Sequence, residues 1–216
     1  MAVRKHIVIT GTGRTGTTFL VELLTKLGLD TGFSLSDIAT KKNKLARAGL
    51  ETDLRSDNCP YIVKDPWFCD YANEIFEQEN IEIEHVFIPI RDLKAAAESR
   101  RYVTKAGMKE VSFVERLKYL LGKRKRFKGG LWHTNSFKQS EQESVLLRQV
   151  YKLMLALSDA NVPITLIKYP RSVKDGIYLF QKLKPILKDI STQHFMEVYT
   201  ETVQPNLVHS FNHSDH

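Results

Sequence analysis

The feature that most constrains the fold is a short apolar run near the N-terminus, followed by a glycine-rich turn and an amphipathic segment. Residues 6–10 read HIVIT and predict a buried strand, and residues 18–28, which end at a glycine, predict a helix. The turn between them, residues 11–18, reads GTGRTGTT and has the glycine spacing of a phosphate-binding loop. A strand, a loop and a helix in this order indicate an α/β fold.

Further strands alternate with helices along the rest of the chain. Strands are predicted at 61–66, 84–90 and 163–168, and helices at 93–103, 113–121, 141–159 and 172–188. This alternation predicts one domain over residues 1–216, of P-loop type, with a mainly parallel sheet and helices on both faces. Right-handed crossovers place the carboxyl ends of all strands at one edge, where the glycine-rich loop and Arg91 would both emerge.

The composition excludes several classes of protein. With 42% hydrophobic and 26% charged residues and no long apolar run, the chain is expected to be an ordinary soluble protein without a membrane span. The N-terminus lacks the apolar core and cleavage site of a signal peptide, which favours a cytoplasmic location. Cys59 and Cys69 lack zinc-ligand spacing, so we expect free thiols and no structural metal. The net charge of +7 predicts anionic partners.

One position in the glycine-rich loop bears on the kind of ligand it could hold. Thr17 stands where a nucleotide kinase or a GTPase has its lysine. The loop N–H groups and the N-terminus of the next helix still favour a phosphate, but the outer groups of a triphosphate would lack their usual partner. The loop therefore predicts the monophosphate end of a ligand. The alternative is a strand-to-helix turn that binds nothing.

Two stretches carry a resemblance to a known family. Residues 14–20 read RTGTTFL, and in residues 87–99 Arg91 at the end of a predicted strand is followed eight positions later by Ser99 on the next helix. These stretches resemble the two nucleotide-binding motifs of sulfotransferases that use 3′-phosphoadenosine 5′-phosphosulfate (PAPS). Weaker similarity covers residues 63–66 and 164–175. The C-terminal arginine-lysine-glycine segment of the small-molecule branch is missing, so the resemblance is to the broader P-loop sulfotransferase superfamily.

The resemblance implies metal-free transfer of a sulfuryl group from PAPS to an acceptor hydroxyl or amine, leaving adenosine 3′,5′-bisphosphate (PAP). The acceptor is unidentified, and an acidic one is an option because of the basic charge. Arg14 matches the family's cation at the bridging oxygen, which makes it the predicted catalytic residue. The residues implied at the donor are Gly13, Arg14, Thr15, Gly16, Thr17 and Thr18 at the 5′ end and Arg91 and Ser99 at the 3′ end.

The general base is a separate question. Asp65 is the first candidate, because the resemblance places the turn at residues 63–66 near the sulfuryl group. The alternative is that Asp65 caps a helix that begins near Trp67. Asp37 and Asp53 are weaker candidates for the base, and the histidines His133 and His209 are weaker still, because no sequence pattern would orient their rings.

A basic stretch at residues 122–134 has glycines near both ends and predicts a mobile loop within the domain, interpreted as a lid or as a solvated run of charge. Two other functions fit parts of the sequence. One is a P-loop small-molecule kinase that uses ATP and magnesium, against which the missing loop lysine argues. The other is a non-catalytic basic protein that binds nucleic acid, but no recognition motif for DNA or RNA supports it.

Overall fold

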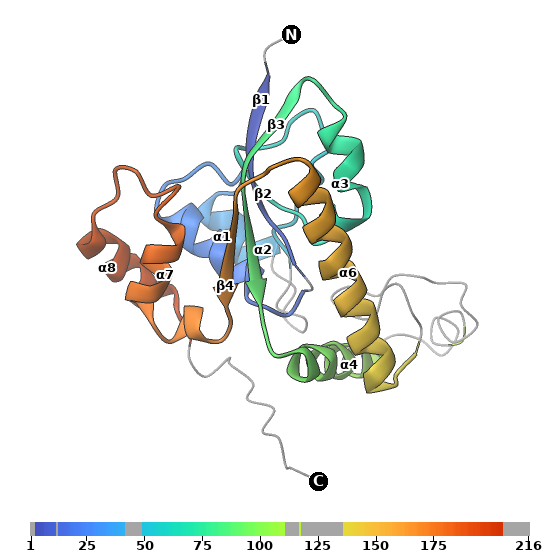
Figure 1. Cartoon of the computed structure of the whole chain (residues 1–216). Coiled ribbons are helices and arrows are strands. Elements are labelled where there is room, and N and C mark those ends of the chain that lie inside the picture. Colours follow the sequence, from blue (N-terminus) through green and yellow to red (C-terminus); the bar gives the residue numbers. More distant parts are fainter. Residues whose placement is uncertain (1–2, 12, 42–48, 111–116, 118–135, 205–216) are drawn as a thin grey trace.

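The computed structural model describes residues 3–11, 13–41, 49–110, 117 and 136–204 (Figure 1). Within these residues four parallel strands form one sheet in the order β2-β1-β3-β4, which confirms the predicted α/β class. The strands are β1 (Arg4–Ile9), β2 (Ile62–Lys64), β3 (Ile81–Ile90) and β4 (Ile164–Lys168). The helices are α1 (Thr17–Lys26), α2 (Leu35–Lys41), α3 (Phe68–Phe76), α4 (Leu93–Glu110), α6 (Gln139–Asp159), the 3₁₀ turn η1 (Arg171–Val173), α7 (Gly176–Leu183) and α8 (Thr192–Thr202).

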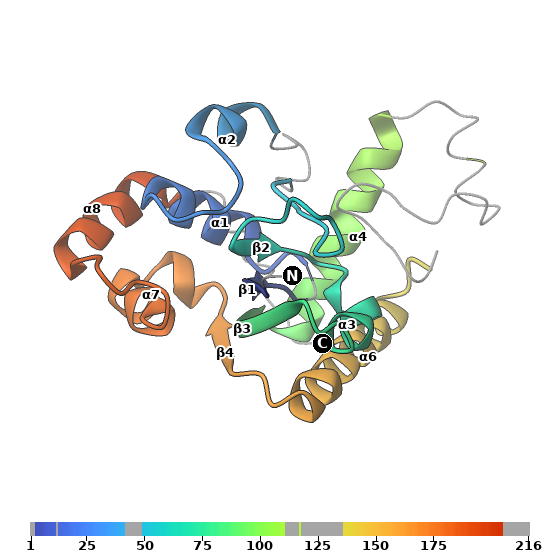
Figure 2. The ribbon, with the colours of Figure 1, turned by 90° about the horizontal axis from the view of Figure 1, so that it is seen from above.

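Helices cover both faces of the sheet (Figure 2). Side chains alternate along a strand, so Ile7 and Ile9 of β1 pack toward α1, α7 and α8, whereas Val8 packs toward α3 and α6. All three are buried, as expected for a continuous apolar run in a central parallel strand. None of the described helices is both long and apolar enough to cross a membrane.

The carboxyl ends of the strands meet at one edge of the sheet. Ile9, the last residue of β1, pairs with Lys64 of β2 and with Phe87 of β3, and Ile90 of β3 pairs with Lys168 of β4. The segments that follow these residues, including the glycine-rich loop after β1, therefore start from the same edge.

Most of the predicted elements are found with shifted ends. β3 begins at Ile81 rather than at residue 84, α4 continues to Glu110 rather than ending near 103, and α6 matches the helix predicted at 141–159. α2 and α8 lie in segments for which no element is predicted. The helix predicted at 113–121, apart from Leu117, and the basic loop predicted at 122–134 lie outside the described residues.

The single helix predicted at 172–188 is wrong. The chain there forms η1 and then α7, whose start is fixed by the Asp175 carboxylate, which accepts a hydrogen bond from the Tyr178 N–H at 2.9 Å. α7 ends at Leu183, before Pro185, which has no N–H to continue the helical hydrogen bonds. The apolar periodicity of this segment is real, but a cap and a proline divide it.

Candidate functional site

The glycine-rich loop leaves β1 and lies against the end of β3. The Thr10 N–H donates to the carbonyl oxygen of Phe87 at 3.1 Å. A Cβ atom on Gly11 would lie 3.1 Å from the carbonyl oxygen of Pro89, which is tighter than ordinary contacts. A glycine at this position therefore allows the backbone of the loop to approach the neighbouring strand.

The loop turns into α1 through left-handed backbone conformations. The φ angles are 70° at Gly13, 60° at Arg14 and 85° at Gly16, and Gly16 is the N-cap of α1. Among the described residues, no side chain caps α1 and its first turn holds no acidic residue, so the positive end of the helix dipole is not neutralised. The Thr15 hydroxyl beside it is buried, 1% exposed for the residue, and has no hydrogen-bond partner within the described structure. Both features suit a bound anion.

Arg14 and Ser99 join the two stretches that the resemblance predicts as the donor site. Arg14 Nε donates to Ser99 Oγ at 3.2 Å across 85 positions of sequence. Ser99 lies on α4 and is 4% exposed. A guanidinium from the loop therefore meets a buried hydroxyl from the helix that follows β3. The sequence predicts the two residues at opposite ends of one ligand, and the structure places them in direct contact.

Arg91, which follows β3, stacks on an aromatic ring that is not among the predicted site residues. Its guanidinium carbon lies 5.1 Å from the centre of the Tyr169 ring, and partial burial lowers the pKa of Arg91. Tyr169 follows β4, and a Cβ atom on Gly16 would lie 3.0 Å from its ring. Tyr169 thus contacts both the loop and Arg91. Its position at the end of a predicted strand, on the edge shared with Arg91, is the signal that could have identified it.

Lys64 brings a second cation to the loop. Its ammonium donates to Thr18 Oγ1 at 2.9 Å, to the carbonyl oxygen of Gly49 at 2.6 Å and to Glu51 Oε1 at 3.0 Å. The side chain is 3% exposed. Burial is the main cause of the lowered pKa of Lys64, and the charge of Arg14 lowers it further, whereas Glu51 raises it. The two cations thus influence each other electrostatically at this edge of the sheet.

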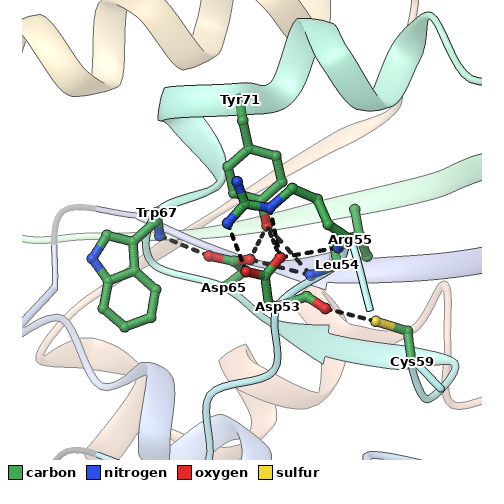
Figure 3. Close-up of polar contacts among 7 residues, drawn as sticks. All are labelled: Asp53, Leu54, Arg55, Cys59, Asp65, Trp67 and Tyr71. Atoms are coloured by element: carbon green, nitrogen blue, oxygen red, sulfur yellow. Dashed lines mark hydrogen bonds and ion pairs between the residues drawn. The ribbon is translucent and has the colours of Figure 1, made fainter. Parts of the chain in front are cut away.

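Asp65 is the predicted general base. Its carboxylate accepts hydrogen bonds from α3, from the residue before α3 and from the segment before β2 (Figure 3). Oδ1 accepts from the Trp67 N–H at 2.8 Å, and Oδ2 accepts from the Leu54 N–H at 3.4 Å and from the Tyr71 hydroxyl. The residue is 1% exposed, and burial raises its pKa. Asp65 thus contacts Trp67, the N-cap residue of α3, but does not itself occupy the N-cap position. Within the structure Asp65 connects two segments to β2.

Tyr71→Phe tests that role of Asp65. The change removes the hydroxyl that donates to the buried Asp65 carboxylate and accepts from the Leu54 N–H at 3.3 Å. It keeps the ring, on which Arg55 stacks at 4.2 Å. We expect the free energy of unfolding to fall by about 1.5 kcal/mol at pH 8, the lower end for a bond to a charged group. Tyr71 lowers the pKa of Asp65, so this loss should shrink as the pH falls and Asp65 is protonated. Urea unfolding between pH 4 and pH 8 measures it.

Tyr61→Phe is the matched control, because its hydroxyl donates to Glu84 Oε2 at 2.6 Å in an exposed position. Its loss should stay below about 0.5 kcal/mol at every pH. If both variants lose the same free energy of unfolding, the buried Asp65 carboxylate does not stabilise the fold more than an exposed one.

The structure thus brings most of the residues that are predicted to bind the donor nucleotide to one edge of the sheet. Arg14, Gly16 and Thr18 of the loop region are each in contact with a residue from another element, namely Ser99, Tyr169 and Lys64 in turn. Gly13 and Thr17 lie in the same loop and first helical turn.

Comparisons with protein-family models, with curated proteins and with solved structures found no match to this chain.

Proposed function

We propose that the protein is a PAPS-dependent sulfotransferase with a P-loop-type fold, and that the carboxyl edge of its sheet binds the donor. The observation that carries this proposal is the hydrogen bond between Arg14 and Ser99, because it joins two motifs that lie far apart in the sequence and resemble the family independently. The uncapped N-terminus of α1 and the buried Thr15 hydroxyl support an anion at the loop.

In the proposed reaction an acceptor hydroxyl or amine attacks the sulfur atom of PAPS. The bond from sulfur to the bridging oxygen breaks, the acceptor loses a proton, and PAP leaves. Loop N–H groups would bind the 5′-phosphate, and the Arg14 guanidinium would stabilise the charge that grows on the bridging oxygen. Binding of the donor requires Arg14 to exchange its bond to Ser99 for bonds to the ligand. The Ser99 hydroxyl and Arg91 can then bind the 3′-phosphate.

A thermal-shift comparison tests the class of ligand. PAP at 100 times its dissociation constant should stabilise the fold by about 2.7 kcal/mol without any metal, which is roughly 5–10 °C in Tm for a chain of this size. AMP, which lacks the 3′-phosphate, should give a much smaller shift at the same concentration. ATP with magnesium and a short oligonucleotide complete the set, since stabilisation by either of them alone would favour the kinase or the nucleic-acid binder. Equal shifts with PAP and AMP would overturn the sulfotransferase proposal.

A further inference from the structure

The segment that precedes β2 lies outside both donor motifs, yet it is hydrogen-bonded to the end of that strand. The Thr52 N–H donates to the Lys64 carbonyl oxygen at 3.0 Å, and the Leu54 N–H donates to the Asp65 carboxylate at 3.4 Å. Glu51 lies in the same segment and accepts from the Lys64 ammonium at 3.0 Å. The hydrogen bonds of residues 49–54 therefore hold the Glu51 carboxylate at a fixed place beside Lys64.

Glu51 opposes the electrostatic cost of burying the Lys64 ammonium. Removing a cation from water is costly unless a carboxylate and further acceptors surround it. Lys64 donates to the Glu51 carboxylate, to the Gly49 carbonyl oxygen and to the uncharged Thr18 hydroxyl of α1, and the charge of Arg14 also acts on it. Glu51 favours the charged form of Lys64, and Arg14 disfavours it. Glu51 also accepts from the Gly49 N–H at 3.0 Å, which limits its own freedom to move.

The Thr18 hydroxyl is the link from Lys64 to the loop. A hydroxyl has one hydrogen to donate, and an ammonium can only donate, so Thr18 Oγ1 accepts from Lys64 Nζ. The O–H hydrogen of Thr18 is then left for another acceptor, such as a phosphate or sulfate oxygen at the N-terminus of α1. The positive charge on Lys64 thus restricts the Thr18 hydroxyl to the role of acceptor toward Lys64.

We infer that Glu51 is a positioning residue, which keeps Lys64 as a fixed second cation beside Arg14 and thereby directs the Thr18 hydroxyl toward the anionic 5′ end of the donor. The nature of that anion rests on the proposed function, whereas the ion pair between Glu51 and Lys64 does not. Loss of the Glu51 charge should therefore change the titration of Lys64 even in the protein without ligand.

Glu51→Gln tests directly whether the Glu51 charge favours the charged form of Lys64. Glutamine keeps an oxygen for the Gly49 N–H and for Lys64 but carries no charge, so the fold is expected to persist. The 13Cε signal of Lys64, assigned by its absence in Lys64→Met, should titrate at a pH lower by about one unit in Glu51→Gln than in the wild type, the smaller end of the effect of a neighbouring charge. Glu82→Gln, which removes an exposed partner of Lys5, should leave Lys64 unchanged. An unchanged Lys64 titration in Glu51→Gln would overturn the inference.

Calorimetry with PAP then separates this inference from the proposed function. PAP affinity in the wild type should fall as the pH rises through the pKa of Lys64, because only the ammonium attracts the anion. In Glu51→Gln the same fall should occur at a pH lower by about one unit. Failure of PAP to bind the wild type would overturn the proposed function, and the lysine titration alone would then decide whether Glu51 holds Lys64. If PAP binds with the same pH profile in both proteins, Lys64 and Thr18 do not serve the donor.

Discussion

Arg14→Ala is expected to lower the rate of sulfuryl transfer about 10²–10³-fold and to weaken PAP binding far less. In the proposed reaction the charge on the bridging oxygen grows mainly in the transition state, so a cation at that oxygen acts on turnover rather than on ground-state affinity. In the same proposal loop N–H groups would hold the 5′-phosphate, and their positions do not depend on this side chain. The transfer rate to an acceptor, or the slow hydrolysis of PAPS by water, is measured beside PAP affinity for each variant.

The structure supplies suitable comparisons for this test. Arg14 has a φ of 60°, and alanine and lysine share the same backbone restriction, so the variants differ in the side chain rather than in the strain of the loop. Arg14→Lys should recover much of the rate, because a single oxygen can be served by a point charge. Ser99→Ala removes the hydrogen bond to Arg14 but keeps the cation, and it should weaken PAP binding more than turnover. Full turnover with lost PAP affinity in Arg14→Ala would make Arg14 a phosphate clamp and direct attention to Lys64.

The sheet is predictable because its strands carry uninterrupted apolar runs. Residues 7–9 of β1 are buried on both faces, and a run of this kind between a polar start and a glycine turn has few other interpretations. The approximate places of Arg91 and Ser99 follow from a strand that leads into a helix, since that junction must lie at the carboxyl edge. What the sequence predicts well is therefore the order of elements and the edge on which the loops meet.

The contacts within the site depend on tertiary packing that local patterns do not carry. Nothing near Glu51 in the sequence indicates that it meets Lys64, because their pairing depends on how the segment before β2 folds back on that strand. The role of Asp65 has two interpretations from the sequence, and only the positions of Leu54 and Tyr71 distinguish them. Tyr169 is not predicted because an aromatic residue beside a proline is usual in loops, and its contacts come from other elements.

Arg91→Ala is expected to weaken PAP binding by roughly 1.5–3 kcal/mol, or about 10- to 150-fold in Kd, and to leave AMP binding nearly unchanged. The difference arises because AMP has no 3′-phosphate for the guanidinium to bind. The Tyr169 ring restricts the Arg91 side chain before the ligand arrives, which reduces the entropy lost on binding. Arg91→Lys should recover only part of the affinity, since an ammonium lacks the planar fork that binds two phosphate oxygens together.

Arg55→Ala is the matched control for this change, because it too removes an arginine that stacks on a tyrosine ring, at 4.2 Å from Tyr71, and pairs with Asp53 rather than with the loop. Arg55→Ala should leave both PAP and AMP affinity unchanged in calorimetry. If Arg91→Ala weakens PAP and AMP to the same degree, its guanidinium supports the loop through Tyr169 instead of binding the 3′-phosphate. Since Tyr169 also contacts Gly16, Tyr169→Leu would then reproduce the loss for both nucleotides. If Arg91 binds the 3′-phosphate, Tyr169→Leu should instead weaken PAP more than AMP, because the guanidinium loses the ring that holds it in place.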